Sequence, residues 1–197
     1  KSISNHEFFA RLGRKLIASL NDYTIDGYVF RVDMRLRPHG ENSPLAISFP
    51  MLEEHFIKQG REWARYAWIK GRVIAGHANI EAESILMEKI VRPFVFRKYL
   101  DFGAYESMRS LHAQLRKEVE RREMHDNIKL GPGGIREIEF ITQVFQLIRG
   151  GRDVDLCIRP TLSVLQRLQK KQQLPQQAVA ELTQAYHFLR KLEHRPQ

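Results

Sequence analysis

An aspartate set among arginines is the most chemically suggestive feature of the sequence. Asp33 alternates with Arg31, Arg35 and Arg37 at steps of two residues. A carboxylate can supply one ligand to Mg²⁺ while arginines contact phosphate oxygens, and phosphoryl or nucleotidyl transfer needs both. On a solvated strand edge the same charges would form an ordinary salt-bridged surface. Both interpretations stay open, because a single Asp supplies only part of a metal site.

A glycine-rich turn that leads into a helical pattern is the second such feature. It begins at Lys129, passes through Gly133 and Gly134, and continues into Arg136. Backbone N–H groups at a helix start favour a phosphate, but the Gly-Lys-Ser/Thr ending of a Walker A loop is absent. A tight loop before a buried helix is the alternative. The polar stripe of that helix, which either bonds neighbouring helices or lines a cleft, consists of Arg136, Glu139, Gln143 and Gln146.

Basic residues also recur at helical spacing in the middle of the chain. Lys58, Arg61, Arg65 and Arg72 follow one another at intervals of three, four and seven residues, which predicts one basic helix face. Such a stripe is usually solvated surface. Lys70 and Arg72 lie next to a predicted turn and are the better candidates for binding a ligand.

Other groupings of reactive residues favour structural roles. Asp153 and Asp155 have a metal-like spacing but lie in a predicted loop, so helix capping explains them. The 8 His show no paired helical spacing and no Cys partner, which argues against zinc. Cys157 is the single Cys and cannot form an internal disulfide, so we expect a small buried residue and a reducing compartment. The basic aromatic segment 92–99 contains no known nucleic-acid motif, so nucleic acid is not the expected partner.

The composition describes a packed globular chain. With 43% hydrophobic and 10% aromatic residues, 197 residues can bury a core without disulfides. The 32 Lys and Arg against 23 Asp and Glu leave a net charge of +9, which favours a polyanion, a phosphorylated ligand or an acidic protein surface as partner. No run approaches the roughly 20 apolar residues that span a bilayer, so we expect no membrane partner. Because no initiator Met is present, we expect a piece of a longer polypeptide.

The elements that position these residues begin with a mixed region. Apolar spacings of three and four predict a helix over residues 5–21, and alternating apolar and charged residues predict a strand over 28–37. A short partner strand is predicted at 45–49. Ser48 as N-cap and Pro50 in the first turn begin a long helix that is expected to run to about residue 74.

The second half of the sequence predicts helices alone. They are expected at about 80–91, 101–124, 134–149, 159–171 and 175–195. We place a domain boundary near Val91, so that a mixed domain at 1–91 precedes an α-helical bundle at 92–197. The predicted fold class is α+β and mostly helical.

Four motifs carry a resemblance to a known family over nearly the whole chain. They are VDMRLRPHG at 32–40, GREWARYAWIKGR at 60–72, NIKLGPGGIREIEF at 127–140 and QLIRGG at 146–151. Together they resemble the bacterial glutamine synthetase adenylyltransferase family, whose members combine an adenylating and an adenylyl-removing half. The forms IREIEF and RPFVFR are more similar to the N-terminal, adenylyl-removing half.

The resemblance implies a polymerase-β-like nucleotidyltransferase domain followed by a helical domain. It implies phosphorolysis, in which inorganic phosphate releases ADP from adenylyl-tyrosine of glutamine synthetase, while the other half adds AMP from ATP. Two metal ions, expected to be Mg²⁺, would neutralise the developing charge. A cytoplasmic enzyme is implied, with glutamine synthetase and a signal-transducing regulatory protein as partners.

The resemblance also assigns roles to residues. Asp33 matches the third metal-binding, catalytic Asp of the superfamily, whereas the D-x-D pair is expected upstream of Lys1. We therefore expect this chain alone to be inactive. The alternative is a docking module for glutamine synthetase or for the regulatory protein. The residues expected to bind substrate or nucleotide are Arg35, Arg37, Lys70, Arg72, Lys129, Gly133, Gly134 and Arg136.

Overall fold

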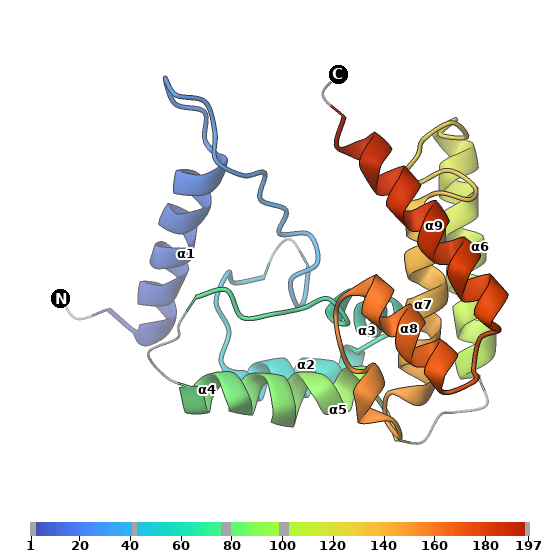
Figure 1. Ribbon diagram of the computed structural model, residues 1–197. Helices are drawn as coiled ribbons and strands as arrows, with labels where there is room; N and C mark the ends of the chain where they lie inside the picture. Colours follow the sequence, from blue (N-terminus) through green and yellow to red (C-terminus); the bar gives the residue numbers. More distant parts are fainter. Residues whose placement is uncertain (1–2, 41–42, 76–79, 99–102, 196–197) are drawn as a thin grey trace. The chain divides into compact units, whose positions relative to one another are not determined.

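Helices make up the regular structure of the described part of the chain. The computed structural model describes residues 3–40, 43–75, 80–98 and 103–195 (Figure 1). Contacts divide the chain into two compact units, Lys1–Gly60 and Arg61–Gln197, which we call the N-terminal unit and the helical unit. The boundary predicted at 91/92 separates a nucleotidyltransferase domain from a helical domain and is a different division from these two compact units. It stays a prediction.

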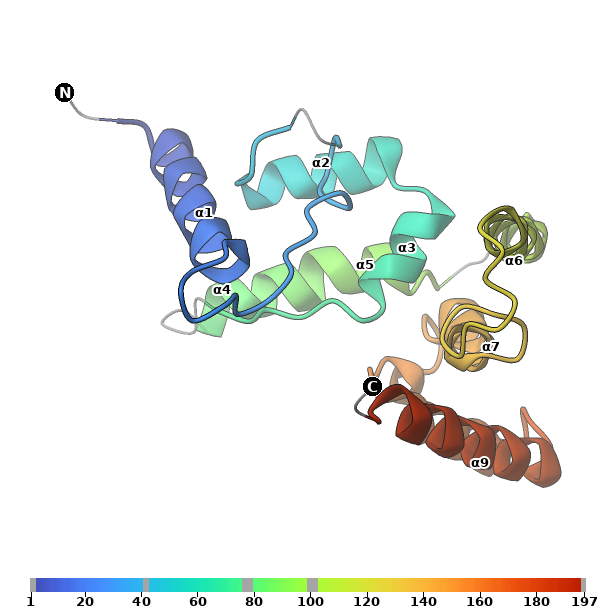
Figure 2. The same ribbon diagram turned by 90° about the horizontal axis from the view of Figure 1, so that it is seen from above.

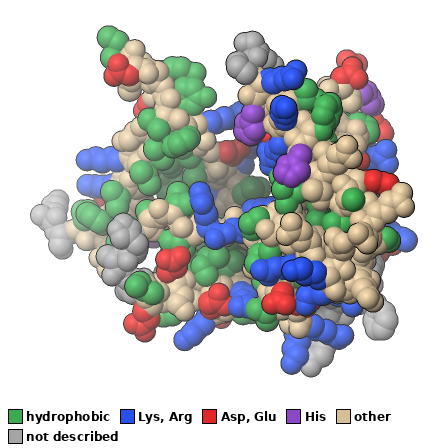
Figure 3. All heavy atoms as spheres, in the orientation of Figure 1, with side chains coloured by type: hydrophobic (Ala, Val, Ile, Leu, Met, Phe, Trp, Pro, Cys, Tyr) green, Lys and Arg blue, Asp and Glu red, His purple; other side chains and the backbone are tan. Residues whose placement is uncertain are grey.

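The first helix of the N-terminal unit is α1, which spans Asn5–Asn21. It starts after Ser4, whose hydroxyl accepts a hydrogen bond from the Glu7 N–H at 3.2 Å and satisfies one free donor of the first turn. None of its residues is buried. Figure 3 shows hydrophobic side chains gathered on the surface over α1 and the loop that follows it. The apolar side of α1 consists of Phe8, Phe9, Leu12 and Leu16, each about half exposed.

The strands predicted at 28–37 and 45–49 were wrong for the described structure. Residues 28–37 form an irregular segment there, and the described part of the chain contains only an isolated bridge between Thr24 and Gly27. A strand is stabilised by a hydrogen-bonded neighbour, and no described segment pairs with this one. The N–H groups of Val29 and Phe30 instead donate to the Leu20 carbonyl at the end of α1. The alternating pattern of residues 28–37 therefore does not form a strand, because no neighbouring strand is described with which it could share backbone hydrogen bonds.

The long helix predicted from Ser48 to residue 74 is broken at Gly60. Helix α2 spans Phe49–Gln59, is capped by Ser48 with Pro50 in its first turn, and buries Leu52 and Phe56. Helix α3 starts again at Glu62 and ends at Trp68. The basic residues predicted to share one helix face are thus separated: Lys58 lies in α2 and Arg65 in α3, whereas Arg61 precedes α3 and Arg72 follows it.

The helical unit confirms the predicted helices of the second half, with ends that shift by a few residues. The start of the helix predicted at 101–124 lies outside the described residues. After α3 the elements are α4 (Ile80–Ser84), the π-helix η1 (Ile85–Val91), α5 (Arg92–Val95), α6 (Ala104–Arg121), α7 (Ile135–Arg149), the 3-10 helix η2 (Val154–Leu156), α8 (Thr161–Lys170) and α9 (Gln176–Glu193).

Helix α7 is the central helix of this unit. It contacts α3, α8, α9 and η2, and it buries Ile135, Ile138 and Leu147. Helices α6 and α7 run side by side in both views (Figures 1 and 2). A second apolar cluster forms where Leu156 meets α8, and it contains Leu156, Val164, Leu168, Phe145, Ile158 and Leu174. The mostly helical part of the predicted α+β fold class is confirmed, whereas its β part is not found among the described residues. None of the described helices combines the length and apolar character that a membrane span requires.

Candidate functional site

The Asp33 carboxylate in the N-terminal unit is paired with Arg35. Arg35 donates to it from its backbone N–H and its Nε, both at 3.0 Å, and its Nη2 lies 2.5 Å from Asp33 Oδ2. These hydrogen bonds, helped by the nearby charge of Arg31, lower the pKa of Asp33 to about 2. The pair lies in an open pocket of about 580 Å³ that Arg31 and Arg37 also line. Asp33 is therefore ionised and surrounded by arginines, as the sequence predicted.

The described residues do not complete a Mg²⁺ site around Asp33. Both of its oxygens already accept hydrogen bonds from Arg35. In the ranges that the structure describes, no three His, Cys, Asp or Glu side chains gather in a way that could hold a metal ion. Mg²⁺ usually takes more than one carboxylate, phosphate oxygens and water. Among the described residues that line this pocket, Asp33 is the one carboxylate that could bind the ion.

Lys70, Lys129 and Arg136 are brought together in the helical unit. They line one pocket of about 320 Å³, which we call the basic pocket. Its remaining lining residues are Tyr66, Ala67, Leu130, Glu139 and Gln143. The sequence predicted the three cations as ligand residues from separate motifs, and the fold places them around the same space.

Helix α7 supplies the polar wall of the basic pocket. Arg136, Glu139 and Gln143 recur on one side of the helix and all line the pocket. Gln146, the fourth member of the predicted stripe, is buried and donates from Nε2 to the Leu156 and Ile158 carbonyls at 2.7 and 2.6 Å. Both interpretations of the stripe are therefore realised, because its first three residues line a pocket and its last residue holds a neighbouring segment.

The glycine-rich turn fixes where Lys129 and Arg136 lie. A Cβ at Gly134 would lie 2.8 Å from the Gly131 carbonyl oxygen, and Gly133 has a positive φ of 72°. The Gly133 N–H donates to Glu137 Oε2 at 2.9 Å, and the Gly134 N–H donates to the Gly131 carbonyl at 3.0 Å. These N–H groups thus already have acceptors within the turn. The assignment of Gly133 and Gly134 as ligand contacts stays a prediction, while the turn clearly shapes the pocket.

Burial changes the ionisation of two basic-pocket residues. It lowers the pKa of Lys70, whose Nζ donates to the Arg159 carbonyl and to Thr161 Oγ1. Burial also raises the pKa of Tyr66 to about 12, although the charge of Arg136 opposes this shift. Tyr66 therefore keeps its proton at physiological pH and can donate a hydrogen bond.

Helix α9 contributes charges that local sequence spacing did not reveal. Arg190 Nη2 lies 3.0 Å from Glu139 Oε1, and the Tyr186 hydroxyl donates to the same oxygen at 3.0 Å. Lys129 Nζ lies 3.1 Å from Glu193 Oε1. Arg190 thereby partly neutralises Glu139, the acid of the basic pocket. Helix α9 thus contacts two residues of that pocket, Glu139 and Lys129.

The other predicted ligand residues do not join the basic pocket. Arg72 lines a separate, larger cleft of about 910 Å³, to which Lys70 also contributes. Arg65, which the sequence predicted to lie on a solvated basic face, is instead buried, with 1% of its surface exposed, and donates to the Phe94 and Val95 carbonyls at the end of α5. Its role is therefore structural.

The helix capping predicted for Asp153 and Asp155 is not observed, because Asp153 precedes η2 without a side-chain capping hydrogen bond. Asp153 and Asp155 both pair with Lys171, at 2.8 and 3.1 Å. The Cys157 thiol donates to the Gly150 carbonyl at 3.2 Å, and burial raises its pKa, which disfavours the reactive thiolate.

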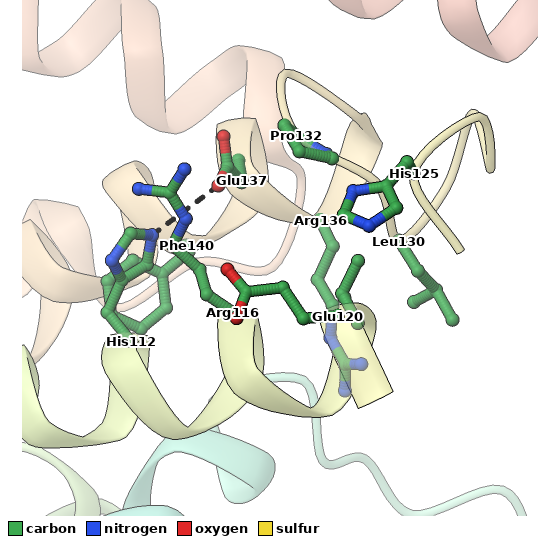
Figure 4. Close-up of a pocket in the computed structure, with 10 residues that line it drawn as sticks. His112, Arg116, Glu120, His125, Leu130, Pro132, Arg136, Glu137 and Phe140 are labelled. Atoms are coloured by element: carbon green, nitrogen blue, oxygen red, sulfur yellow. Dashed lines mark ion pairs between the residues drawn. The ribbon is translucent and has the colours of Figure 1, made fainter. Parts of the chain in front are cut away.

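A smaller cavity adjoins the basic pocket between α6 and α7. It has a volume of about 230 Å³, and we call it the α6–α7 cavity (Figure 4). It shares Leu130 and Arg136 with the basic pocket. Its other lining residues are His112, Arg116, Val119, Glu120, His125, Pro132, Glu137 and Phe140.

Two family models and several relatives match parts or all of this chain. Residues 1–86 match the family described as glutamate-ammonia ligase adenylyltransferase, and residues 109–197 match the family described as GlnD PII-uridylyltransferase. The whole chain is 81% identical to part of the bifunctional glutamine synthetase adenylyltransferase/adenylyl-removing enzyme of Nitrosomonas eutropha, and equally to that of Nitrosomonas europaea. It is 60% identical to part of the enzyme of the same name from Chromobacterium violaceum. The chain is thus similar, over its full length, to a segment of these bifunctional enzymes.

The resemblance drawn from the four motifs is therefore confirmed. The chain spans about a fifth of the length of the relatives that it matches. Asp33 and Lys70 fall in the part that matches the adenylyltransferase family, whereas Lys129 and Arg136 fall in the part that matches the uridylyltransferase family. The basic pocket thus combines a residue from the segment that matches the first family, Lys70, with residues from the segment that matches the second, Lys129 and Arg136.

Proposed function

We propose that this chain is part of the adenylyl-removing half of an enzyme that regulates glutamine synthetase by reversible adenylylation. In the proposed reaction, inorganic phosphate attacks the phosphorus of adenylyl-tyrosine. The bond from that phosphorus to the tyrosine oxygen breaks, ADP leaves, and the tyrosine oxygen recovers a proton. The nucleotidyltransferase part would be polymerase-β-like and the enzyme cytoplasmic, as the resemblance implies.

The convergence of Lys70, Lys129 and Arg136 on one pocket is the observation that carries the phosphate-binding part of this proposal. The glycine turn and α7 hold the backbones of Lys129 and Arg136, so that both side chains line the same pocket and can be directed to one anion. Phosphate oxygens are strong acceptors for Lys and Arg donors. Arg190 already offsets the negative charge of Glu139, which would otherwise repel an anion.

Asp33 is proposed as one carboxylate ligand of Mg²⁺ in the complete enzyme. Its low pKa keeps the carboxylate charged, as a metal ligand must be. Arg35 and Arg37 in the same pocket would contact phosphate oxygens of ATP or ADP. When bound, the ion would supply charge neutralisation that the described residues cannot supply alone.

The test replaces Asp33 in an enzyme of the relatives' full length that carries this segment. Asp33→Asn should abolish phosphate-dependent release of ADP from adenylylated glutamine synthetase and leave AMP addition from ATP largely intact. Asp26→Asn, an exposed change in a turn of the same unit, serves as the matched control. Loss of both activities in Asp33→Asn with an unfolded protein would point to damage, and full retention of AMP removal would refute the proposal.

A docking function for the helical unit is the second candidate, and the match of residues 109–197 favours it. An adenylyltransferase and a uridylyltransferase transfer different nucleotides, so a helical segment that is similar in both need not recognise the nucleotide. Such a segment can instead bind a protein partner that both enzymes share. The second family is described as a PII-uridylyltransferase, and we propose the signal-transducing protein PII as the shared partner. Titration of the chain with such a protein and with glutamine synthetase would test this role, and binding of neither would exclude it.

A further inference from the structure

Two opposite charges face the α6–α7 cavity without partners in the part of the chain that the structure describes. Arg116 and Glu120 lie on consecutive turns of α6 and line the cavity. Among the described residues, neither side chain makes a hydrogen bond or an ion pair, with each other or with a neighbour. Figure 4 shows both side chains extending from α6 toward α7. The cavity therefore offers a strong donor and a strong acceptor close together.

The rest of the wall is suited to a flat ring. Phe140 packs against His112 with ring centroids 5.0 Å apart, and Leu130, Pro132 and Val119 add apolar surface. The volume of about 230 Å³ is below the roughly 300–1,000 Å³ of pockets that hold drug-sized ligands. That space suits one ring system rather than a whole cofactor. Bases stack readily on aromatic side chains.

The other carboxylate of the cavity is already engaged. Glu137 accepts the Gly133 N–H at 2.9 Å and lies 3.6 Å from His112 Nε2. Glu120 is thus the acid left to receive a ligand's donor, and Arg116 is the matching donor. An exocyclic amine beside a ring nitrogen presents this pair of groups, as the amino-substituted edge of adenine does.

We propose that the α6–α7 cavity binds the base of a nucleotide with an exocyclic amine, whose phosphate lies in the basic pocket. Glu120 accepts from the amine, Arg116 donates to a ring nitrogen, and Phe140 supports the ring. The basic pocket shares Leu130 and Arg136 with the cavity, so a nucleotide can contact both. This inference rests on the proposed function, because it takes the basic pocket to bind phosphate and extends that assignment to the phosphate of a nucleotide.

The test compares ADP with IDP, which has a carbonyl oxygen in place of the amine. Calorimetric titration of the complete chain should show ADP binding about tenfold tighter than IDP, because the Glu120 carboxylate repels the carbonyl oxygen. Glu120→Gln should weaken ADP binding about tenfold and remove the preference, since an amide can also donate to the carbonyl. Inorganic phosphate should bind the variant as it binds the original chain.

The controls keep the two proposals separate. Glu106→Gln and Lys117→Met change exposed residues of α6 outside the cavity and should leave ADP binding unchanged. Equal binding of ADP and IDP by the original chain would overturn the base assignment while phosphate binding upheld the basic pocket. Binding of free amino acids in place of ADP would also overturn it, because a zwitterion would then be the partner of Arg116 and Glu120. An equal loss of ADP, IDP and phosphate in Glu120→Gln would likewise count against it.

Discussion

Arg190 of α9 reaches Glu139 of α7 at 3.0 Å, although 51 residues separate them in the chain. Glu139 is the acid among the residues that line the basic pocket. The Tyr186 hydroxyl, which also accepts from Arg190, donates to the same carboxylate oxygen. The net charge around the basic pocket therefore depends on Arg190 of α9 as well as on the residues that line the pocket.

Removing the carboxylate of Glu139 should strengthen anion binding. In Glu139→Gln the negative charge is lost and Arg190 keeps its own, so we expect phosphate affinity to rise about threefold at low salt. The gain should disappear in high salt, because the effect is electrostatic. Calorimetric titration with phosphate measures it, and Glu181→Gln, an exposed change on α9, is the control. Unchanged or weaker phosphate binding at low salt would contradict the assigned role of Glu139.

Lys129 and Arg136 should provide most of the phosphate affinity. Each substitution, Lys129→Gln or Arg136→Gln, removes one charged donor, and we expect about a tenfold loss of phosphate affinity from each. Arg149→Gln, at the exposed end of α7, should leave phosphate affinity unchanged and serves as the matched control. If all three variants lost affinity alike, net charge would explain the binding and the basic pocket would not.

Buried Arg65 should contribute to stability. Its guanidinium donates to the Phe94 and Val95 carbonyls and pairs with Glu62 at 2.6 Å. Arg65→Met leaves buried acceptors without donors, so the free energy of unfolding of the helical unit should fall by about 3 kcal/mol. Urea unfolding followed by circular dichroism measures this, with exposed Arg61→Met as the control. A change below about 1 kcal/mol would show that water replaces the guanidinium.

The predictable part of this chain is the part governed by local pattern. Apolar spacing gave the helices that became α1, α7, α8 and α9 within a few residues. The stretch from Lys129 to Arg136 could be assigned because one glycine turn holds both residues. Local periodicity is enough for such features, since the contacts that stabilise them lie within a few residues.

The missed parts depend on residues that are distant in sequence. The contact of Tyr186 and Arg190 with Glu139 has no local signature. The alternating pattern of residues 28–37 predicted a strand, yet a strand also needs a neighbour, and no described segment pairs with it. Gly60 was overlooked as a helix end because the apolar pattern continues on both sides of it.

The 197-residue chain by itself should neither remove nor add AMP. Asp33 is the carboxylate of its pocket, and no metal-ligand cluster of three occurs among the described residues. Nucleotidyl transfer needs further carboxylates to hold the metal ions. Incubation with adenylylated glutamine synthetase, Mg²⁺ and phosphate, followed by assay of ADP, tests this. Measurable phosphate-dependent release of ADP would show that the chain holds a complete site.

Arg35 should control the ionisation of Asp33. The pKa of Asp33 is about 2 instead of its ordinary 3.8, chiefly because of hydrogen bonds from the Arg35 side chain. A depressed carboxyl pKa stabilises the folded state above the ordinary value, and this stabilisation is lost as the pH falls toward 2. In Arg35→Met the pKa should rise toward 3.8, as measured by NMR titration of the carboxyl carbon. Arg31→Met should shift it much less, because Arg31 acts only through its charge. A pKa that stays near 2 in Arg35→Met would show that another group holds the carboxylate ionised.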